Sequence, residues 1–217
     1  MEFEVIQINI NNLKTKTMKN IDNNSAVVNN SVIESTNPVN RWRKENGVIY
    51  FSVTSNGKTG KEWIEHLKDE RYHIDGDAKD LLLSKAFNPT SGVTTEIAIL
   101  TRTSLLRPKY LMGFTTSDII NEAAILKFVK PNAEVACLIR EMISDKEMGA
   151  MGFRYITVMH EAYELHNSKN ATYAPGHHYF MYLGLTSESG GHELTASDIH
   201  PESHTFAMHD GFAFVVR

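Results

Sequence analysis

Five stretches of the chain are predicted to be β-strands, because apolar, β-branched and aromatic residues dominate them or alternate with polar ones. The sequence FRYITVMH has the strongest strand pattern, and GFAFVV begins at an Asp-Gly pair that is typical of a turn. The expected strands span residues 47–53, 93–100, 153–160, 177–185 and 211–216.

Helices are predicted where apolar residues recur every three to four positions, mostly in the middle of the chain. Thr59 is placed to cap the first helix, and Ser144 opens a Ser-x-x-Glu capping box for a short helix that ends at Gly152. The expected helices span approximately residues 60–71, 77–86, 117–128, 132–143 and 145–152. This order favours an α+β fold, with about four helices packed on one face of a mixed or mostly antiparallel sheet.

The first forty residues differ in composition from the rest of the chain. Residues 1–10 alternate enough for a short strand, but residues 11–40 are rich in Asn, Lys, Thr and Ser and contain no aromatic residue. Such a segment buries too little apolar surface to offset the entropy lost on ordering. We therefore predict a flexible Asn-rich N-terminal arm over residues 1–40, which could order on a partner, and a single domain over residues 41–217.

The composition narrows the classes of partner. A net charge of −4 over 217 residues provides no broad basic field, so nucleic acid is an unexpected partner. No apolar run approaches the length of a membrane span, and the N-terminus lacks the pattern of a secretory signal. The one cysteine excludes an internal disulfide and fits a reducing compartment. We expect no membrane partner, and a cytoplasmic location or one within a phage particle.

The stretch SNGKTGKEW, residues 55–63, superficially resembles a phosphate-binding loop. A Walker A loop requires glycine where Ser55 stands and a hydroxyl residue where Glu62 stands, so the match fails at two positions. A weaker interpretation is an anion site at a helix N-terminus, with Lys58, Thr59, Gly60 and Lys61 as its residues. The alternative is a turn in which Gly57 has a positive φ and Thr59 caps the helix.

Histidines are concentrated near the C-terminal end of the chain, where eight of ten lie between residues 160 and 209. Because histidine is a common metal ligand, this density raises the possibility of a bound metal ion. The sequence HEAYELH lacks the His-Glu-x-x-His spacing of zinc proteases. If a site exists, His160 and His209 are its first candidates, because each lies beside a predicted strand. Otherwise residues 162–209 form a His-rich region of solvated loops with no cofactor.

A cysteine nucleophile is a further hypothesis. On the predicted helix 132–143, Cys137 lies about 200 degrees from Val135 and therefore off the main apolar stripe. His160 could act as its base, and Glu161 or Asp210 could orient that base. Papain-like enzymes also place a cysteine on a helix and a histidine on a later strand. The sequence EVACLIRE lacks their local signature, however, and a lone cysteine is more often a small buried residue.

Several segments carry a resemblance to known sequences: KPNAEVACLIRE, VMHE, GFAFVV, SNGKTGKEW and SGVTTEIAIL. Through them the chain resembles a group of uncharacterised bacterial proteins, over roughly residues 48–161 and the last strand. The resemblance implies one domain with a variable region near residues 162–209, and it directs attention to His160 and Glu161. It implies no activity, cofactor or site residue.

The leading functional hypothesis is a module that binds a protein or a small ligand. The alternatives are a hydrolase-type enzyme that uses Cys137 and His160, and a metal-binding protein that uses the C-terminal histidines.

Overall fold

The computed structural model describes residues 41–101, 104–105, 114–165, 179–187, 192–199, 206–207 and 209–217. The predicted arm over residues 1–40, including its possible short strand, lies outside the described residues. No helix among the described residues is long and apolar enough to cross a membrane.

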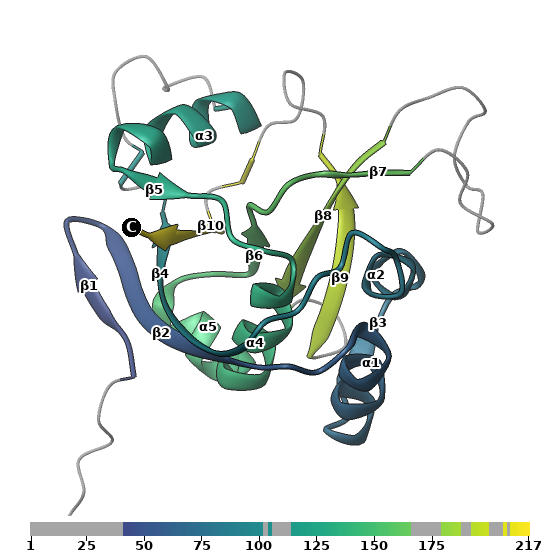
Figure 1. The fold of residues 1–217 in the computed structure, drawn as a ribbon. Coiled ribbons are helices and arrows are strands. Elements are labelled where there is room, and N and C mark those ends of the chain that lie inside the picture. The colour runs from purple at the N-terminus through teal and green to yellow at the C-terminus, as the bar shows by residue number, and fades with distance from the viewer. Residues whose placement is uncertain are drawn as a thin grey trace, which may run out of the picture. The chain divides into compact units, whose positions relative to one another are not determined.

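Ten strands form one mixed sheet, and Figure 1 shows its strong curvature. The strands follow the order β1-β2-β4-β10-β6-β8-β9-β3, while β5 pairs with β10 and β7 pairs with β8. Their bounds are β1 Arg43–Glu45, β2 Val48–Asn56, β3 His73–Ile74, β4 Ser91–Leu100, β5 Phe128–Val129, β6 Tyr155–Val158, β7 Tyr163–Leu165, β8 Tyr179–Thr186, β9 Glu193–Asp198 and β10 Asp210–Val216. Among the described strands only the pairs β6–β10 and β3–β9 are parallel, so the sheet is mixed and mostly antiparallel, as the sequence predicts.

The described residues contain five helices between the strands, and side-chain caps define where most of them begin. Their bounds are α1 Gly60–Asp69, α2 Gly76–Leu82, α3 Thr116–Ile125, α4 Glu134–Met142 and α5 Asp145–Met151. Complete capping boxes begin α1, α3 and α5, where a hydroxyl and a carboxylate three residues later satisfy backbone N–H groups of the first turn. Gly152 ends α5 with a φ of 93°, a backbone conformation that glycine adopts without strain.

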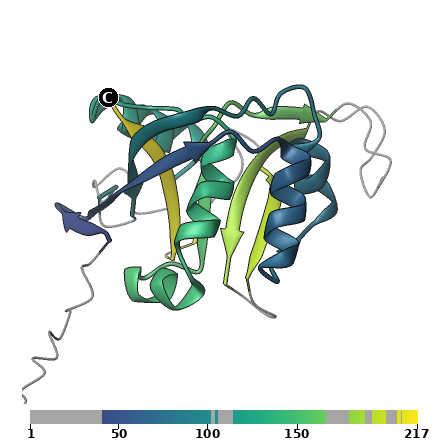
Figure 2. The same ribbon diagram turned by 60° about the horizontal axis from the view of Figure 1, so that its bottom comes forward.

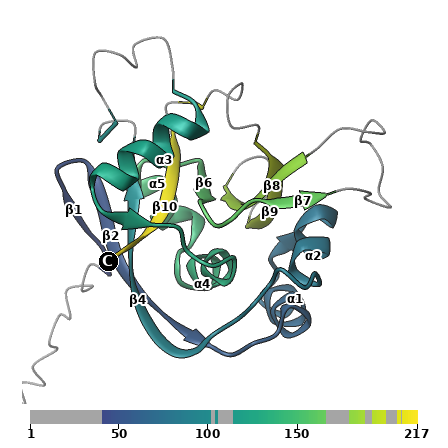
Figure 3. The ribbon, with the colours of Figure 1, turned by 45° about the horizontal axis from the view of Figure 1, so that its top comes forward.

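The sheet carries a separate apolar cluster on each face. Buried residues of α1, α2, α4 and α5 pack with Ile49, Ile97, Ile156 and Leu183 on one face. Alternate residues of the same strands point to the other face, where α3 covers part of a second cluster. Figures 2 and 3 show α4 within the curve of the sheet, with β2 and β4 on one side of it and β8 and β9 on the other. The expected α+β fold is therefore confirmed, and the helices on one face number four.

The strands missed by sequence analysis have weak apolar patterns. Strands β1, β3, β5 and β7 have two or three residues each, which is too short for alternation to be visible. Strand β9, with the sequence ELTASD, buries only Leu194 fully and lies in the region interpreted as His-rich loops. That region also contains β7 and β8, so much of it belongs to the sheet.

Candidate ligand-binding pocket

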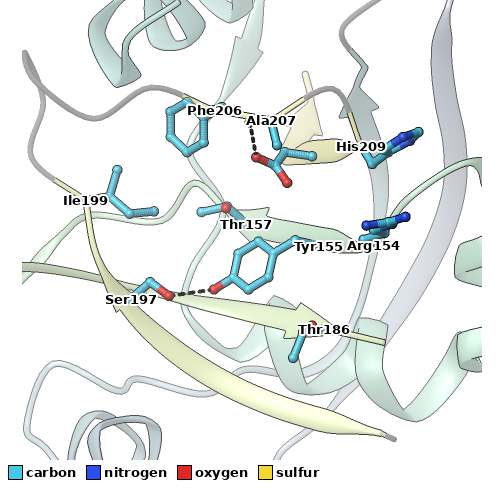
Figure 4. A pocket seen from close by; sticks show the side chains of 10 residues that line it. Arg154, Tyr155, Thr157, Thr186, Ser197, Ile199, Phe206, Ala207 and His209 are labelled. Atoms are coloured by element: carbon cyan, nitrogen blue, oxygen red, sulfur yellow. Dashed lines mark hydrogen bonds between the residues drawn. The ribbon is translucent and has the colours of Figure 1, made fainter. Parts of the chain in front are cut away.

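A pocket of about 330 Å³ lies on the α3-bearing face of the sheet, over β6, β8 and β9. Figure 4 shows its lining side chains. Hydroxyl groups line it from three strands, and an apolar wall and a charged rim complete it. The lining residues are Tyr155, Thr157, Thr186, Ser197, Ile199, Phe206 and Ala207, with Arg154, His209 and Asp210 beside them.

The strand register places these hydroxyl groups together. Tyr155 and Thr157 are two residues apart on β6, so they point to the same face. Tyr155 pairs with Thr186 of β8 and with Asp210 of β10, which brings all three side chains to that face. Ser197 joins them from β9 across β8. The pocket is therefore a consequence of sheet pairing between segments that are distant in the sequence.

The Tyr155 ring reaches Ser197 by lying across Gly184 of β8. A Cβ atom at Gly184 would stand 2.8 Å from Cε1 of the ring, too close for any side chain. With glycine there, the Tyr155 hydroxyl lies 2.9 Å from Oγ of Ser197, as Figure 4 shows. Burial raises the pKa of Tyr155 to about 12, so the phenol stays protonated and provides both a donor and an acceptor.

Thr157 contributes the most informative atom of the pocket. Its side chain is fully buried, and its Oγ1 atom has no hydrogen-bond partner among the described residues. A buried hydroxyl without a partner costs about 1–3 kcal/mol relative to a paired one. Because Thr157 lines the pocket, a bound molecule with a hydrogen-bonding group could supply the missing partner.

The wall and rim of the pocket are held by local contacts. The Phe206 ring packs edge-on against Phe212 at a centroid distance of 4.6 Å and stacks on Phe114 at 6.2 Å. The carboxylate of Asp210 accepts the N–H of Ala207 at 2.6 Å, which ties this segment to the start of β10. Figure 4 shows Arg154 and His209 side by side at one end.

His160 lies outside the pocket and serves the sheet. Its Nε2 atom accepts the backbone N–H of Leu183 at 2.9 Å, and its Nδ1 atom lies 2.6 Å from the carbonyl oxygen of Glu161. Since Nε2 must accept, the proton of the neutral ring is on Nδ1. Burial lowers the pKa of His160 to about 4. Both ring nitrogens are therefore occupied at neutral pH, and neither is available as a general base or a metal ligand.

The structure does not join His160 and His209 in a metal site. His209 is an exposed residue at the pocket rim, whereas His160 is buried with both ring nitrogens bonded. Across the described part of the chain, no group of three or more histidine, cysteine, aspartate and glutamate side chains is arranged to hold a metal ion. Five further histidines lie outside the described residues: His166, His177, His178, His200 and His204.

Cys137 is fully buried among the apolar residues between α4 and the sheet. Burial raises the pKa of its thiol, which opposes formation of a nucleophilic thiolate. Arg140 does not activate it either, because its guanidinium donates to the carbonyl of Ile143 at 2.6 Å and lies 2.9 Å from Asp145. The carboxylate of Glu161 lies 2.7 Å from Lys130 and so does not orient the His160 ring. This geometry favours structural roles for Cys137 and His160.

The N-terminus of α1 is occupied by its own carboxylate. Glu62 accepts from the backbone N–H of Thr59 at 2.7 Å and from its hydroxyl at 2.8 Å, and these bonds lower the pKa of Glu62. Lys58 lies 3.2 Å from Glu141 and over the Trp63 ring, and Lys61 lies 3.9 Å from Glu65. The proposed anion site is therefore filled by negative charge, whereas the expected capping role of Thr59 is present.

Two glycines of the same stretch have purely structural roles. Gly57 has a φ of 79°, as expected for the turn before α1. A Cβ atom at Gly60 would overlap the carbonyl oxygen of Leu82, so this glycine permits close packing of α1 against the end of α2. The glycines thus serve a turn and a helix contact.

Of the residues around the pocket, sequence reasoning singled out His209, as a candidate metal ligand, and it missed the hydroxyl residues. The one local signal was Thr157, a polar residue between Ile156 and Val158 in the strongest strand pattern. Comparison with protein-family models, with curated proteins and with solved structures finds no match to this chain. The resemblance to uncharacterised bacterial proteins consequently stays a prediction, and the function is inferred from the pocket.

Proposed function

We propose that residues 41–217 form a binding module for a small polar molecule, with the pocket over β6, β8 and β9 as its site. The ligand would present a hydrogen-bonding group to Thr157 and to the Tyr155–Ser197 pair. An apolar or aromatic part of it would lie against Phe206 and Ile199. A nucleoside or a hydroxylated aromatic compound has this combination of groups.

The observation that supports this proposal is the hydroxyl of Thr157, which lines the pocket, is buried and has no hydrogen-bond partner among the described residues. A buried hydroxyl that lacks a partner among the described residues lowers stability, and a hydrogen bond from a ligand would offset that cost. The pocket volume of about 330 Å³ lies at the small end of the range typical of ligand sites. The Tyr155–Ser197 hydrogen bond adds a donor and an acceptor that are already held in position.

The test is a nuclear magnetic resonance titration with uridine, adenosine, benzyl alcohol and 2-phenylethanol, using wild-type protein and the variant Thr157→Val. At least one of these compounds should shift the amide signals of Thr157, Ser197 and Phe206. Valine preserves the shape of threonine and removes its hydroxyl, so the affinity should fall about 5- to 150-fold, equivalent to about 1–3 kcal/mol.

The structure offers a matched control in Thr116. This threonine is also fully buried, and its Oγ1 atom has no hydrogen-bond partner in the part of the chain that the structure describes, but it lies in the first turn of α3 and does not line the pocket. Thr116→Val should leave binding unchanged. An absence of binding by all four compounds, or an equal loss in both variants, would contradict the proposal.

We also propose, from the free thiol of Cys137 and the weakly acidic composition, that the protein acts in the cytoplasm or within a phage particle.

A further inference from the structure

A second cavity, of about 170 Å³, lies between β2, β4 and the start of α4, on the opposite face of the sheet from the ligand-binding pocket. Its base is formed by buried residues, among them Val53, Leu138 and Glu134. Thr90, Lys130 and Asn132 are exposed and form its mouth. The cavity therefore combines apolar walls, an opening to solvent and one buried acidic side chain.

The carboxylate of Glu134 is only half satisfied. Its Oε2 atom accepts from the N–H of Thr90 at 2.8 Å and from the Thr90 hydroxyl at 3.1 Å. Its Oε1 atom is also buried, since the residue is only 1% exposed. That atom has no hydrogen-bond partner among the described residues. The hydrogen bonds from Thr90 fix the orientation of the carboxylate, so the free oxygen is held in place.

Lys130, the cationic residue that lines the cavity, is already paired with another residue. The ammonium of Lys130, at the mouth, lies 2.7 Å from the carboxylate of Glu161. No lysine, arginine or histidine of the described residues forms an ion pair with Glu134. A buried carboxylate without a cation is costly, because the low-dielectric interior does not replace its hydration.

We propose that this cavity binds a primary alkylammonium group, with the charged nitrogen on Oε1 of Glu134 and the alkyl stem against Val53, Val135 and Leu138. The apolar walls distinguish this ligand from a metal ion, because Ca²⁺ and Mg²⁺ require several oxygen ligands around them. An ammonium group needs fewer acceptors, and an alkyl stem is compatible with walls of valine and leucine. Both a free amine and a lysine side chain carry this group.

The test uses n-butylammonium chloride as the probe and n-butanol as its neutral counterpart. Binding is followed from the amide signals of Thr90 and Val135 in wild-type protein. n-Butylammonium should bind at least about tenfold more tightly than n-butanol, because only the cation can pair with Glu134. Equal affinities, or no binding of n-butylammonium, would overturn the proposal and leave the cavity as a site for water. This comparison needs no variant and so is independent of folding effects.

Two variants of the same helix then locate the contact. Glu134→Gln keeps an acceptor for Thr90 and removes the charge, so n-butylammonium should bind at least about tenfold more weakly. Glu141→Gln removes a carboxylate that is 37% exposed and lies outside the cavity, and binding should not change. A loss of affinity in both variants, or in neither, would overturn the assignment to Glu134.

A third arm distinguishes the two sources of the ammonium group. Acetyl-lysine-methylamide presents the same cation on a peptide unit. Tighter binding of this compound than of n-butylammonium indicates a lysine side chain of a partner, and weaker binding indicates a free amine. Either result supports an ammonium site, provided that binding depends on Glu134.

Discussion

The Nε2 atom of His160 accepts the backbone N–H of Leu183 at 2.9 Å, so a side chain completes the sheet between β6 and β7. Strand β6 pairs with β8 from Gly184 to Thr186, and β7 pairs with it from Tyr179 to Met181. Leu183 lies between these two pairings. On this side of β8 its N–H donates to the His160 side chain and not to a neighbouring strand. The histidine that looked most like a catalytic base therefore acts as a hydrogen-bond acceptor within the sheet.

Replacing His160 should destabilise the fold. His160→Ala leaves the N–H of Leu183 buried without a partner and opens a void, so we expect a loss of about 3 kcal/mol in the free energy of unfolding. His160→Gln should lose less, because its amide oxygen can accept the same N–H. Urea denaturation measures both values. His209→Ala, at an exposed position, serves as the control and should change stability by less than about 0.5 kcal/mol. Equal stabilities of His160→Ala and wild type would contradict this role.

The lowered pKa of His160 predicts that acid destabilises the protein. In the folded state the ring stays neutral down to about pH 4, whereas in the unfolded chain it binds a proton below its usual pKa of 6.5. The unfolded state therefore binds more protons between these values, and stability falls as the pH falls through this window. We expect a loss of about 1.5 kcal/mol between about pH 6.5 and about pH 5.

The variant His160→Gln isolates this effect, because glutamine does not titrate. Hydrogen bonds from the cap residues lower the pKa values of Glu62 and Glu147. Their contributions to the free energy of unfolding are therefore lost only below the pH range considered for His160. Denaturant unfolding at several pH values between about 5 and 6.5 measures the free energy of unfolding. This free energy should fall with pH in the wild type and fall less steeply in the variant. The same slope in both proteins would assign the effect to other groups.

Cys137 should be unreactive in the folded protein. The thiol is fully buried and burial raises its pKa, so a thiol reagent such as dithionitrobenzoate should modify it only after unfolding. Labelling at about pH 8 with and without urea tests this expectation. Rapid labelling of the folded protein would revive the cysteine–histidine hypothesis. Cys137→Ser should cost about 1–3 kcal/mol, because a hydroxyl is harder to bury than a thiol.

The pocket depends on the glycine beneath Tyr155. In Gly184→Ala, the added methyl group would collide with the tyrosine ring and displace its hydroxyl from Ser197. We expect a loss of about 2 kcal/mol in stability and altered amide signals at Ser197. Gly149→Ala is a suitable control, because a Cβ atom there meets nothing within 4 Å and alanine favours the helix α5. The control should be as stable as wild type or more stable. An unperturbed Ser197 signal in Gly184→Ala would show that the ring does not lie on Gly184.

Local sequence patterns predicted those parts of the molecule whose interactions are themselves local. The capping boxes at Thr59 and Ser144 each join residues three positions apart, so their spacing is visible in the sequence. The last four residues of β4 and the four residues from Gly211 to Phe214 of β10 are buried, and both strands have conspicuous apolar runs. Strand β9 was missed because its polar residues Thr195 and Ser197 face partners that only the folded sheet supplies.

The functional residues were harder to predict for the same reason. Sequence analysis favoured residues of conspicuous chemical type, namely Cys137, His160 and the two lysines at the start of α1, Lys58 and Lys61. The structure instead draws attention to Thr157 and Glu134, whose types are ordinary but which each bury an oxygen atom that has no hydrogen-bond partner among the described residues. Whether a polar atom finds a partner depends on every segment around it, and no short pattern encodes that.

The sequence by itself determined the α+β class, the approximate positions of the five described helices and the caps at Thr59 and Ser144, because hydrophobic periodicity and hydrogen bonds within a single turn depend on neighbouring residues. Tertiary structure alone decided where the chemistry lies. The Tyr155–Ser197 contact joins residues 42 positions apart, and the Thr90–Glu134 contact joins residues 44 positions apart. Such contacts depend on strand register and helix docking, and these are set by how the whole chain packs its apolar faces.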